Sequence, residues 1–235
     1  MTQFEELAEG CISTILSRTT PVDAGRFSVI SKTFHSAADS DAALYLALSD
    51  RPIIVDNGLK SFQLDRKSGK ICYMLGARSL SICWVHDERY WKWITMRTSR
   101  FPEAAKLLNV CWLEICGTIN TIALSPNTEY AAYLVFKMVD PHRFQIRPAE
   151  LSVFVEGGHS STKNVCLDPN VDDRSHNRVV GLQCPNVRSD GWLEIEMGEF
   201  FNSGIENEEV HMKVLEKGAY WKRGLIVEGI EIRPK

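Results

Sequence analysis

The sequence lacks the features of several large classes of protein. No apolar run approaches the roughly 20 residues that span a bilayer. Residues 1–6 are acidic, without the basic segment and apolar stretch of a secretory signal. The chain has 27 basic against 30 acidic residues, so the basic excess of nucleic-acid-binding proteins is missing too. We therefore expect partners other than membranes and nucleic acids.

Motifs of catalysis and metal binding are missing as well. The chain has no Gly-x-Ser-x-Gly, Walker, Gly-x-Gly-x-x-Gly or His-Glu-x-x-His motif, so no cofactor is expected. Its six histidines are scattered, and we expect them to be solvated. Among the seven cysteines there is no Cys-x-x-Cys pair, and Cys111 and Cys116 would point to opposite faces of one strand. Their odd number favours reduced thiols, as in the cytoplasm or nucleus, and no metal site.

The N-terminal part of the chain shows the periodicity of short helices. Apolar side chains recur on one helical face in residues 7–16. Thr20 is suited to cap a second helix with Pro21 in its first turn. Apolar residues then repeat at helical spacing up to Phe34, and a third apolar segment follows. Three short helices make a small core, so we expect this module to keep an apolar face for a partner.

From about residue 51 onward the hydrophobic pattern alternates with a period of two, which is typical of strands. Residues 62–75 predict a hairpin around a glycine-containing turn, and residues 130–139 are apolar on both faces, as in a central strand. In this part of the chain, only residues 102–108 show a helical pattern. Further strands are expected at 151–155, 192–197, 210–215 and 224–232. The predicted fold class is mainly β, an antiparallel β-sandwich.

A group of aromatic residues surrounds one predicted turn. Trp84 ends one strand, and Tyr90, Trp91 and Trp93 open the next. An indole face can stack on the C–H face of a sugar ring, and nearby carboxylates can accept hydrogen bonds from its hydroxyl groups. Packing in the core is the alternative, because tryptophan is highly buried on average. Core packing is the role expected for Trp93, Trp112, Trp192 and Trp221.

Three segments near the N-terminus, 4–16 (FEELAEGCISTIL), 20–24 (TPVDA) and 29–34 (VISKTF), resemble the successive parts of an F-box. The resemblance implies that this module docks on a Skp-type adaptor of a cullin ubiquitin ligase through its apolar helix faces. The adaptor-contacting residues that it implies are Leu7, Ile12, Ile15, Leu16, Pro21 and Phe34.

Five later segments cover most of the remaining chain: 70–78 (KICYMLGAR), 90–93 (YWKW), 103–114, 190–195 (DGWLEI) and 224–235 (GLIVEGIEIRPK). In this order they resemble the plant phloem lectin family, phloem protein 2. The resemblance is strongest to the branch of this family that carries an F-box, the B branch. The resemblance implies two domains. Residues 1–48 would form a small α-helical F-box, and residues 49–235 a lectin-like, jelly-roll-like β-sandwich that binds carbohydrate.

The function implied by this resemblance is that of a non-catalytic substrate receptor in a Skp–cullin–F-box ubiquitin ligase. Such a receptor would capture a glycan or glycoprotein in the cytoplasm and nucleus and raise its concentration near the ubiquitin-charged enzyme. The family's sugar site uses two tryptophans and acidic residues. Trp84 and Trp91 match the tryptophans, and Glu209 and Glu216 fall near the acidic positions.

Two departures from the family pattern concern the F-box. Leu7-Ala8 stands in place of the usual Leu-Pro, at an expected cost of about 1 kcal/mol. Ala42-Ala43 then runs directly into residues 44–48, without the usual tryptophan, apolar anchor and serine-rich spacer, so the last helix is expected to be shortened.

Three alternatives to a glycan-binding ligase receptor stay open. One is a free-standing lectin with a non-functional F-box, which would bind sugar but no adaptor. A second is a receptor that recognises protein in place of sugar. The third is an enzyme, such as a glycosidase with paired carboxylates, which would need a deep cleft of converging titratable groups.

Overall fold

The computed structural model describes residues 52–156, 158, 160–170, 179 and 181–235. Ile54–Ser61, the described part of Tyr73–Arg233, and Lys235 belong to one structural unit, and Phe62–Cys72 belongs to a second. The three helices predicted before residue 49 and the six adaptor-contacting residues lie outside the described residues and stay predictions. Within the described residues, no helix is long and apolar enough to cross a membrane.

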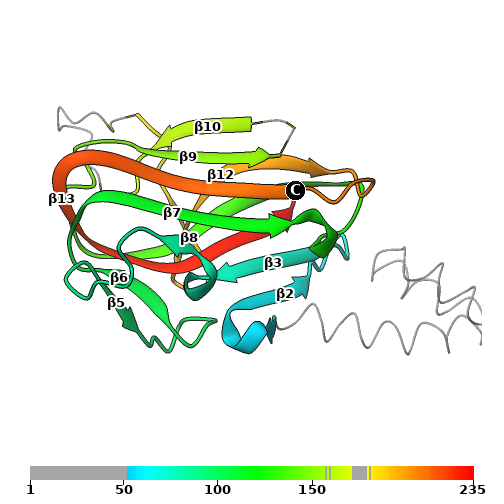
Figure 1. The fold of residues 1–235 in the computed structure, drawn as a ribbon, viewed down its shortest axis with the longest axis horizontal. Helices are drawn as coiled ribbons and strands as arrows, with labels where there is room; N and C mark the ends of the chain where they lie inside the picture. The colour runs from blue at the N-terminus through cyan, green and yellow to red at the C-terminus, as the bar shows by residue number, and fades with distance from the viewer. Residues whose placement is uncertain (1–51, 157, 159, 171–178, 180) are drawn as a thin grey trace, which may run out of the picture. The chain divides into compact units, whose positions relative to one another are not determined.

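One layer of strands is built around the first half of β13 (Glu209–Pro234), as Figure 1 shows. On one side this half pairs with β9 (Ala149–Val155), which pairs in turn with β10 (Ser160–Val165). On the other side it pairs with β7 (Val110–Asn120), which pairs with β4 (Ser81–Ile82). All of these pairs are antiparallel. We call this layer the β9 sheet.

A second layer, the β8 sheet, contains the other half of β13. This half pairs with β3 and β6 and neighbours β8, which pairs with β12, and β12 with β11. β5 extends the layer by pairing with β6. The bounds are β3 (Ile71–Gly76), β5 (Trp91–Ile94), β6 (Ala104–Leu107), β8 (Thr128–His142), β11 (Asn186–Val187) and β12 (Leu193–Asn202).

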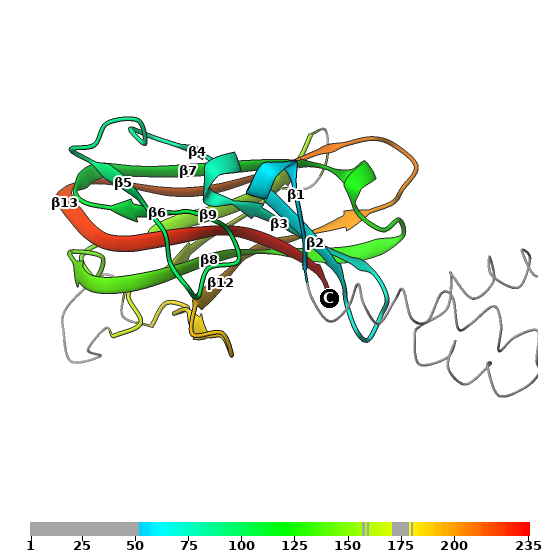
Figure 2. The same ribbon diagram turned by 90° about the horizontal axis from the view of Figure 1, so that it is seen from below.

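β13 belongs to both layers because it bends between them. Its register against β7 shifts between Lys217 and Lys222, and Gly224 adopts a positive φ of 97°, which a glycine tolerates without strain. We call residues 217–224 the bend. In Figure 1 the strand turns back there from its orange half to its red half, and Figure 2 shows the two layers from below.

Alternation of apolar side chains explains how the layers enclose a core. On β13, Val210 and Met212 are buried and belong to the same hydrophobic cluster as Leu134 of β8. The adjacent Val135 points to the opposite face, where it belongs to a smaller cluster with Trp192. β8 is therefore covered on both faces, which confirms the central strand predicted at residues 130–139.

The strands β2 (Lys60–Leu64) and β3 are neighbours joined by a short turn, which confirms the predicted hairpin. In this turn the Asp65 carboxylate accepts hydrogen bonds from the backbone N–H groups of Lys67 and Ser68 at 3.1 and 2.7 Å. The remaining short elements are β1 (Ile53–Val55) and three 3-10 segments at Asp56–Gly58, Ala77–Ser79 and Thr121–Ala123.

The mainly β, antiparallel architecture predicted from the sequence is confirmed, with two corrections. Residues 102–108 are not helical, because β6 pairs with both β5 and β13. Ala104 and Ala105 are fully buried between these strands, so tertiary pairing outweighs a weak helical pattern. The strands expected at 210–215 and 224–232 are the two halves of the single strand β13.

Candidate functional site

An exposed cluster of aromatic rings lies near the bend of β13. Trp84, in the turn after β4, keeps 59% of its surface exposed, and Trp221, in the bend, keeps 44%. The Tyr90 ring lies between them, with its centroid 5.9 Å from that of Trp84 (edge to face) and 6.4 Å from that of Trp221 (stacked). We call these three residues the aromatic patch. Exposed apolar groups that lie together are typical of binding surfaces.

The turn that carries Trp84 is held by its own hydrogen bonds. The backbone N–H of Asp87 donates to the carbonyl of Trp84 at 3.0 Å. The Asp87 carboxylate accepts bonds from the Arg89 guanidinium, which lower the pKa of Asp87. Arg89 in turn lies 5.3 Å from the centre of the Tyr90 ring. This turn keeps Trp84 at a φ of 66°, which is a strained value for a bulky residue.

A hollow of about 590 Å³ opens beside the same turn. Three of the residues that line it, His86, Glu88 and Lys92, carry polar side chains, and Trp91 and Trp93 are also in its lining. The polar groups of the hollow neighbour Trp84 and Tyr90 along the chain. Hydrogen-bonding groups near exposed aromatic rings are the combination that recognises a sugar, whose ring has apolar faces and a polar edge.

Trp91 has a structural role. Only 2% of its surface is exposed, and its indole N–H donates to the carbonyl of Cys83 at 3.0 Å. Its side chain belongs to the main hydrophobic core. The prediction that Trp91 stacks on sugar beside Trp84 is therefore corrected, because only Trp84 offers an open ring face. A turn separates Trp84 from Trp91, so the number of residues between them does not determine whether their side chains point to the same face.

Glu216 is buried at the base of the bend, where it forms an ion pair with the equally buried Lys222. The Lys222 ammonium also donates to the carbonyls of Cys111 and Tyr220, at 2.7 and 3.1 Å. Lys222 therefore joins Glu216, which precedes the bend, to Cys111 of β7 and to Tyr220, the neighbour of Trp221. The structure thus gives the Glu216 carboxylate a buried ion-pair partner, and its contact with sugar stays a prediction.

Glu209 lies at the start of β13, opposite Asn120, whereas Lys217 at the bend pairs with Trp112 near the other end of β7. Eight residues of extended strand span about 26 Å. The structure therefore separates Glu209 from the aromatic patch. Of the four residues predicted to bind sugar, Trp84 alone belongs to this patch.

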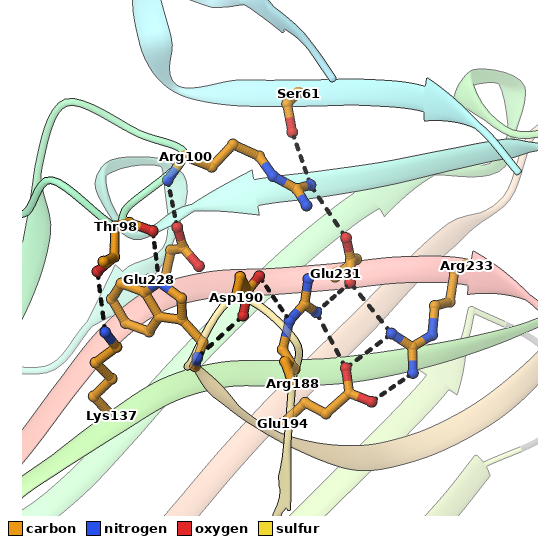
Figure 3. Close-up of polar contacts among 11 residues, drawn as sticks. Ser61, Thr98, Arg100, Lys137, Arg188, Asp190, Glu194, Glu228, Glu231 and Arg233 are labelled. Carbon is orange, nitrogen blue, oxygen red and sulfur yellow. Dashed lines mark hydrogen bonds and ion pairs between the residues drawn. The ribbon is translucent and has the colours of Figure 1, made fainter. Parts of the chain in front are cut away.

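A cluster of charged side chains lies at the β8 sheet, as Figure 3 shows. Arg188 donates hydrogen bonds to Glu231 and Glu194, at 2.6 and 3.1 Å. Arg100 donates to the other oxygen of Glu231 at 3.1 Å, and Arg233 contacts both oxygens of Glu194 at 2.7 and 2.8 Å. We call these five residues the ion-pair network.

The charges of the ion-pair network compensate one another. Burial would raise the pKa of Glu231, but Arg100, Arg188 and Arg233 together outweigh burial and lower it. Because buried charges are tolerated when they are paired, the network serves the fold. Arg100 and Arg188 come from segments outside the strands, and their bonds fasten these segments to β12 and β13.

Trp192 extends this anchoring region and confirms the core role expected for it. It is fully buried, and its indole N–H donates to the carbonyl of Thr98 at 2.8 Å. The Lys137 ammonium lies 4.7 Å from the centre of its ring and donates to the Thr98 hydroxyl at 3.0 Å, a bond drawn in Figure 3.

Comparison with known proteins gives the family of the chain. Residues 70–234 match the family described as phloem protein 2. F-box protein PP2-B10 of Arabidopsis thaliana is 42% identical over 259 residues, which cover 98% of this chain and 94% of the relative. Putative F-box protein PP2-B2 of the same plant is 40% identical over 260 residues, covering 98% and 83%. The chain belongs to the phloem protein 2 family.

These alignments are longer than the 235 residues of this chain, so the relatives contain residues without a counterpart here. Among solved structures, a family 35 carbohydrate binding module from Clostridium thermocellum is 11% identical and covers 68% of this chain and 96% of its own, with a TM-score of 0.35. A likeness this weak carries no argument about fold or ligand.

Within this family member, sequence reasoning missed one residue of the aromatic patch. Trp221 was expected in the core, as was Trp112, but both are substantially exposed. The available signal was local: Gly218 and Gly224 flank the segment that contains Trp221 and indicate an interruption of the strand.

Proposed function

We propose that this phloem protein 2 family member is the substrate-recognition subunit of a Skp–cullin–F-box ubiquitin ligase, and that its aromatic patch binds a glycan or glycoprotein. The observation that carries the proposal is the exposure of Trp84 beside Tyr90 and Trp221. The names of its relatives, which identify F-box proteins of the same family, support the ligase role.

The geometry of the aromatic patch suits a pyranose ring. Trp84 and Trp221 are both open to solvent, and Tyr90 holds their relative position through two ring contacts. Stacking on an indole desolvates the apolar face of a sugar and leaves its hydroxyl groups at the edge. Glu88, His86 and Lys92, beside the turn, can exchange hydrogen bonds with those hydroxyls.

The rest of the molecule acts as a scaffold in this proposal. The two layers that share β13 support a jelly-roll-like, lectin-like sandwich at residues 49–235, with the F-box before it at residues 1–48. The protein itself catalyses nothing. It holds its target near the ubiquitin-charged enzyme and so raises the effective concentration of that target. We propose the cytoplasm and nucleus as its location.

A glycan array tests the sugar-binding part. The full chain should bind a restricted set of glycans, and Trp84→Ala should lose that set, because it removes the most exposed ring of the patch. Phe201→Ala is the matched control, since Phe201 is an exposed aromatic residue on β12, outside the patch. Binding that survives in Trp84→Ala but fails in Phe201→Ala would contradict the proposal.

Co-purification tests the ligase part. The chain, expressed with a plant Skp adaptor, should elute with it in size exclusion, and Leu16→Glu should abolish the complex. No complex with a folded chain would contradict the receptor role. If sugar binding persisted in that case, the free-standing lectin with a non-functional F-box would take its place.

A further inference from the structure

Three potential metal ligands meet on the outer face of the β9 sheet, at the end of β13 opposite to the bend. They are His211, Glu209 and Glu156, and one ligand atom from each lies within 4.8 Å of the other two. Glu209 and His211 are two residues apart on β13, so they share one face, whereas Val210 between them is buried. Glu156 directly follows β9, and its backbone N–H donates to the carbonyl of Glu209 at 3.1 Å.

The His211 ring is oriented by its two direct cross-strand neighbours. Thr118 of β7 lies opposite His211, and its hydroxyl is 3.3 Å from Nδ1. Phe154 of β9 lies opposite it on the other side, and the two rings stack with centroids 4.5 Å apart. Nε2 lies 3.6 Å from Glu209, and in the tautomer whose Nδ1–H donates to Thr118, Nε2 carries the lone pair that a metal ion requires. A second-sphere bond of this kind is usual for histidines that bind metals.

The electrostatics favour a cation at the same place. Among the described residues, neither Glu156 nor Glu209 forms an ion pair with a lysine or arginine, and the nearest basic group recorded for Glu209 is the His211 ring. Two carboxylates held this close repel each other. A divalent ion between them would remove that repulsion and accept the imidazole nitrogen as a third ligand.

We propose that Glu156, Glu209 and His211 form a binding site for Zn²⁺. One imidazole nitrogen and two carboxylate oxygens are ligands that this borderline ion accepts, and three protein ligands leave a position for water. Ca²⁺ and Mg²⁺ prefer sites made of oxygen alone. The site is independent of the proposed glycan binding, because six to eight residues of extended strand, about 20–26 Å, separate it from the bend of β13.

Calorimetric titration of the reduced full chain with ZnCl₂ tests the site. We expect His211→Asn to bind one Zn²⁺ fewer than the wild type. His142→Asn is the matched control, because His142 is an exposed histidine of β8 outside the cluster, and it should bind as the wild type does. An unchanged stoichiometry in His211→Asn would overturn the proposal, and comparing stoichiometries removes the contribution of other histidines and cysteines.

Two further measurements assign the ligands. Glu156→Gln and Thr118→Val should each weaken this site about 10-fold or more, the range usual for losing a ligand or its second-sphere partner. Zn²⁺ should also protect His211, but not His142, from modification by diethylpyrocarbonate, as followed by mass spectrometry. Equal modification of His211 with and without Zn²⁺ would contradict the site. Thermal unfolding without metal checks that each variant is folded.

Discussion

The ion-pair network and the aromatic patch reverse the usual distribution of residues in a protein. In the network, the charged Glu231 lies inside, with only 3% of its surface exposed, and its partners are partly buried. In the patch, tryptophans lie outside. The charged groups are stable there because each one finds partners within the network. The rings of the patch touch one another but leave their outer faces to solvent. The comparison shows that the polar cluster maintains the fold and that the apolar one is available for a ligand.

The family resemblance extends over both regions, to different degrees. The segments 190–195 and 224–235, which carry much of the resemblance, supply Glu194, Glu231 and Arg233 to the network. In the patch, Tyr90 lies in the resembling segment 90–93, and Trp84 is a position that the resemblance matches to a tryptophan of the family. Trp221 lies outside the resembling segments, so the resemblance covers the network more completely than the patch.

Among the changes to charged residues, the largest loss of stability is expected from Glu231→Ala. This change leaves the partly buried Arg100 and Arg188 without their shared carboxylate, and breaking a buried ion pair costs about 3–5 kcal/mol. Urea unfolding measures it. The control is Glu103→Ala, which breaks the exposed 2.7 Å pair with Arg78 and should cost less than about 1 kcal/mol. Equal losses in the two variants would show that the network adds no special stability.

A loss of about 3 kcal/mol is expected from Glu216→Gln, because the buried Lys222 then loses its charge partner. The double variant Glu216→Leu, Lys222→Met should recover most of that loss, since it removes both charges. Glycan affinity should fall in Glu216→Gln if this pair positions Trp221. A stable Glu216→Gln protein would contradict the positioning role of the pair.

The pH dependence of stability should separate two buried carboxylates. The folded-state pKa of Glu231 is lowered from 4.5, so its contribution is present above pH 4.5 and is lost as the pH falls through the folded value. Burial raises the pKa of Glu228, so its contribution is present below pH 4.5 and is lost as the pH rises through its folded value. Unfolding across pH 3–7 should therefore show the difference between wild type and Glu231→Gln shrinking toward acid. A difference that stays constant would contradict the pairing.

The smallest effect on stability is expected from Trp84→Ala. Its side chain is exposed, so the free energy of unfolding should change by no more than about 0.5 kcal/mol. Trp91→Ala removes a core side chain and should cost about 3–5 kcal/mol. Thermal unfolding of both variants tests this contrast, and comparable losses would place Trp84 in the core.

The sequence predicted the parts of the fold that depend on local pattern. The hairpin of β2 and β3 and the doubly buried β8 follow from alternation and turn residues. The strand β6 was missed because two buried alanines are compatible with a helix or a strand, and only pairing with β5 and β13 decides. The candidate site was predicted in part. Trp84 was found from its aromatic neighbours, but Trp221 is brought beside Tyr90 by a bend more than 120 residues later, which no local pattern contains.

The central claim is that the aromatic patch binds sugar through Trp84 and Trp221. The most direct measurement is a titration, by calorimetry, of the strongest glycan from the array into the wild type, Trp84→Ala, Trp221→Ala and Phe201→Ala. We predict that Trp84→Ala weakens binding about 30-fold or more, as when a hot-spot tryptophan is lost. Trp221→Ala should weaken it less, and Phe201→Ala not at all, with all four proteins unfolding at similar temperatures. Unchanged affinity in a folded Trp84→Ala protein would contradict the claim.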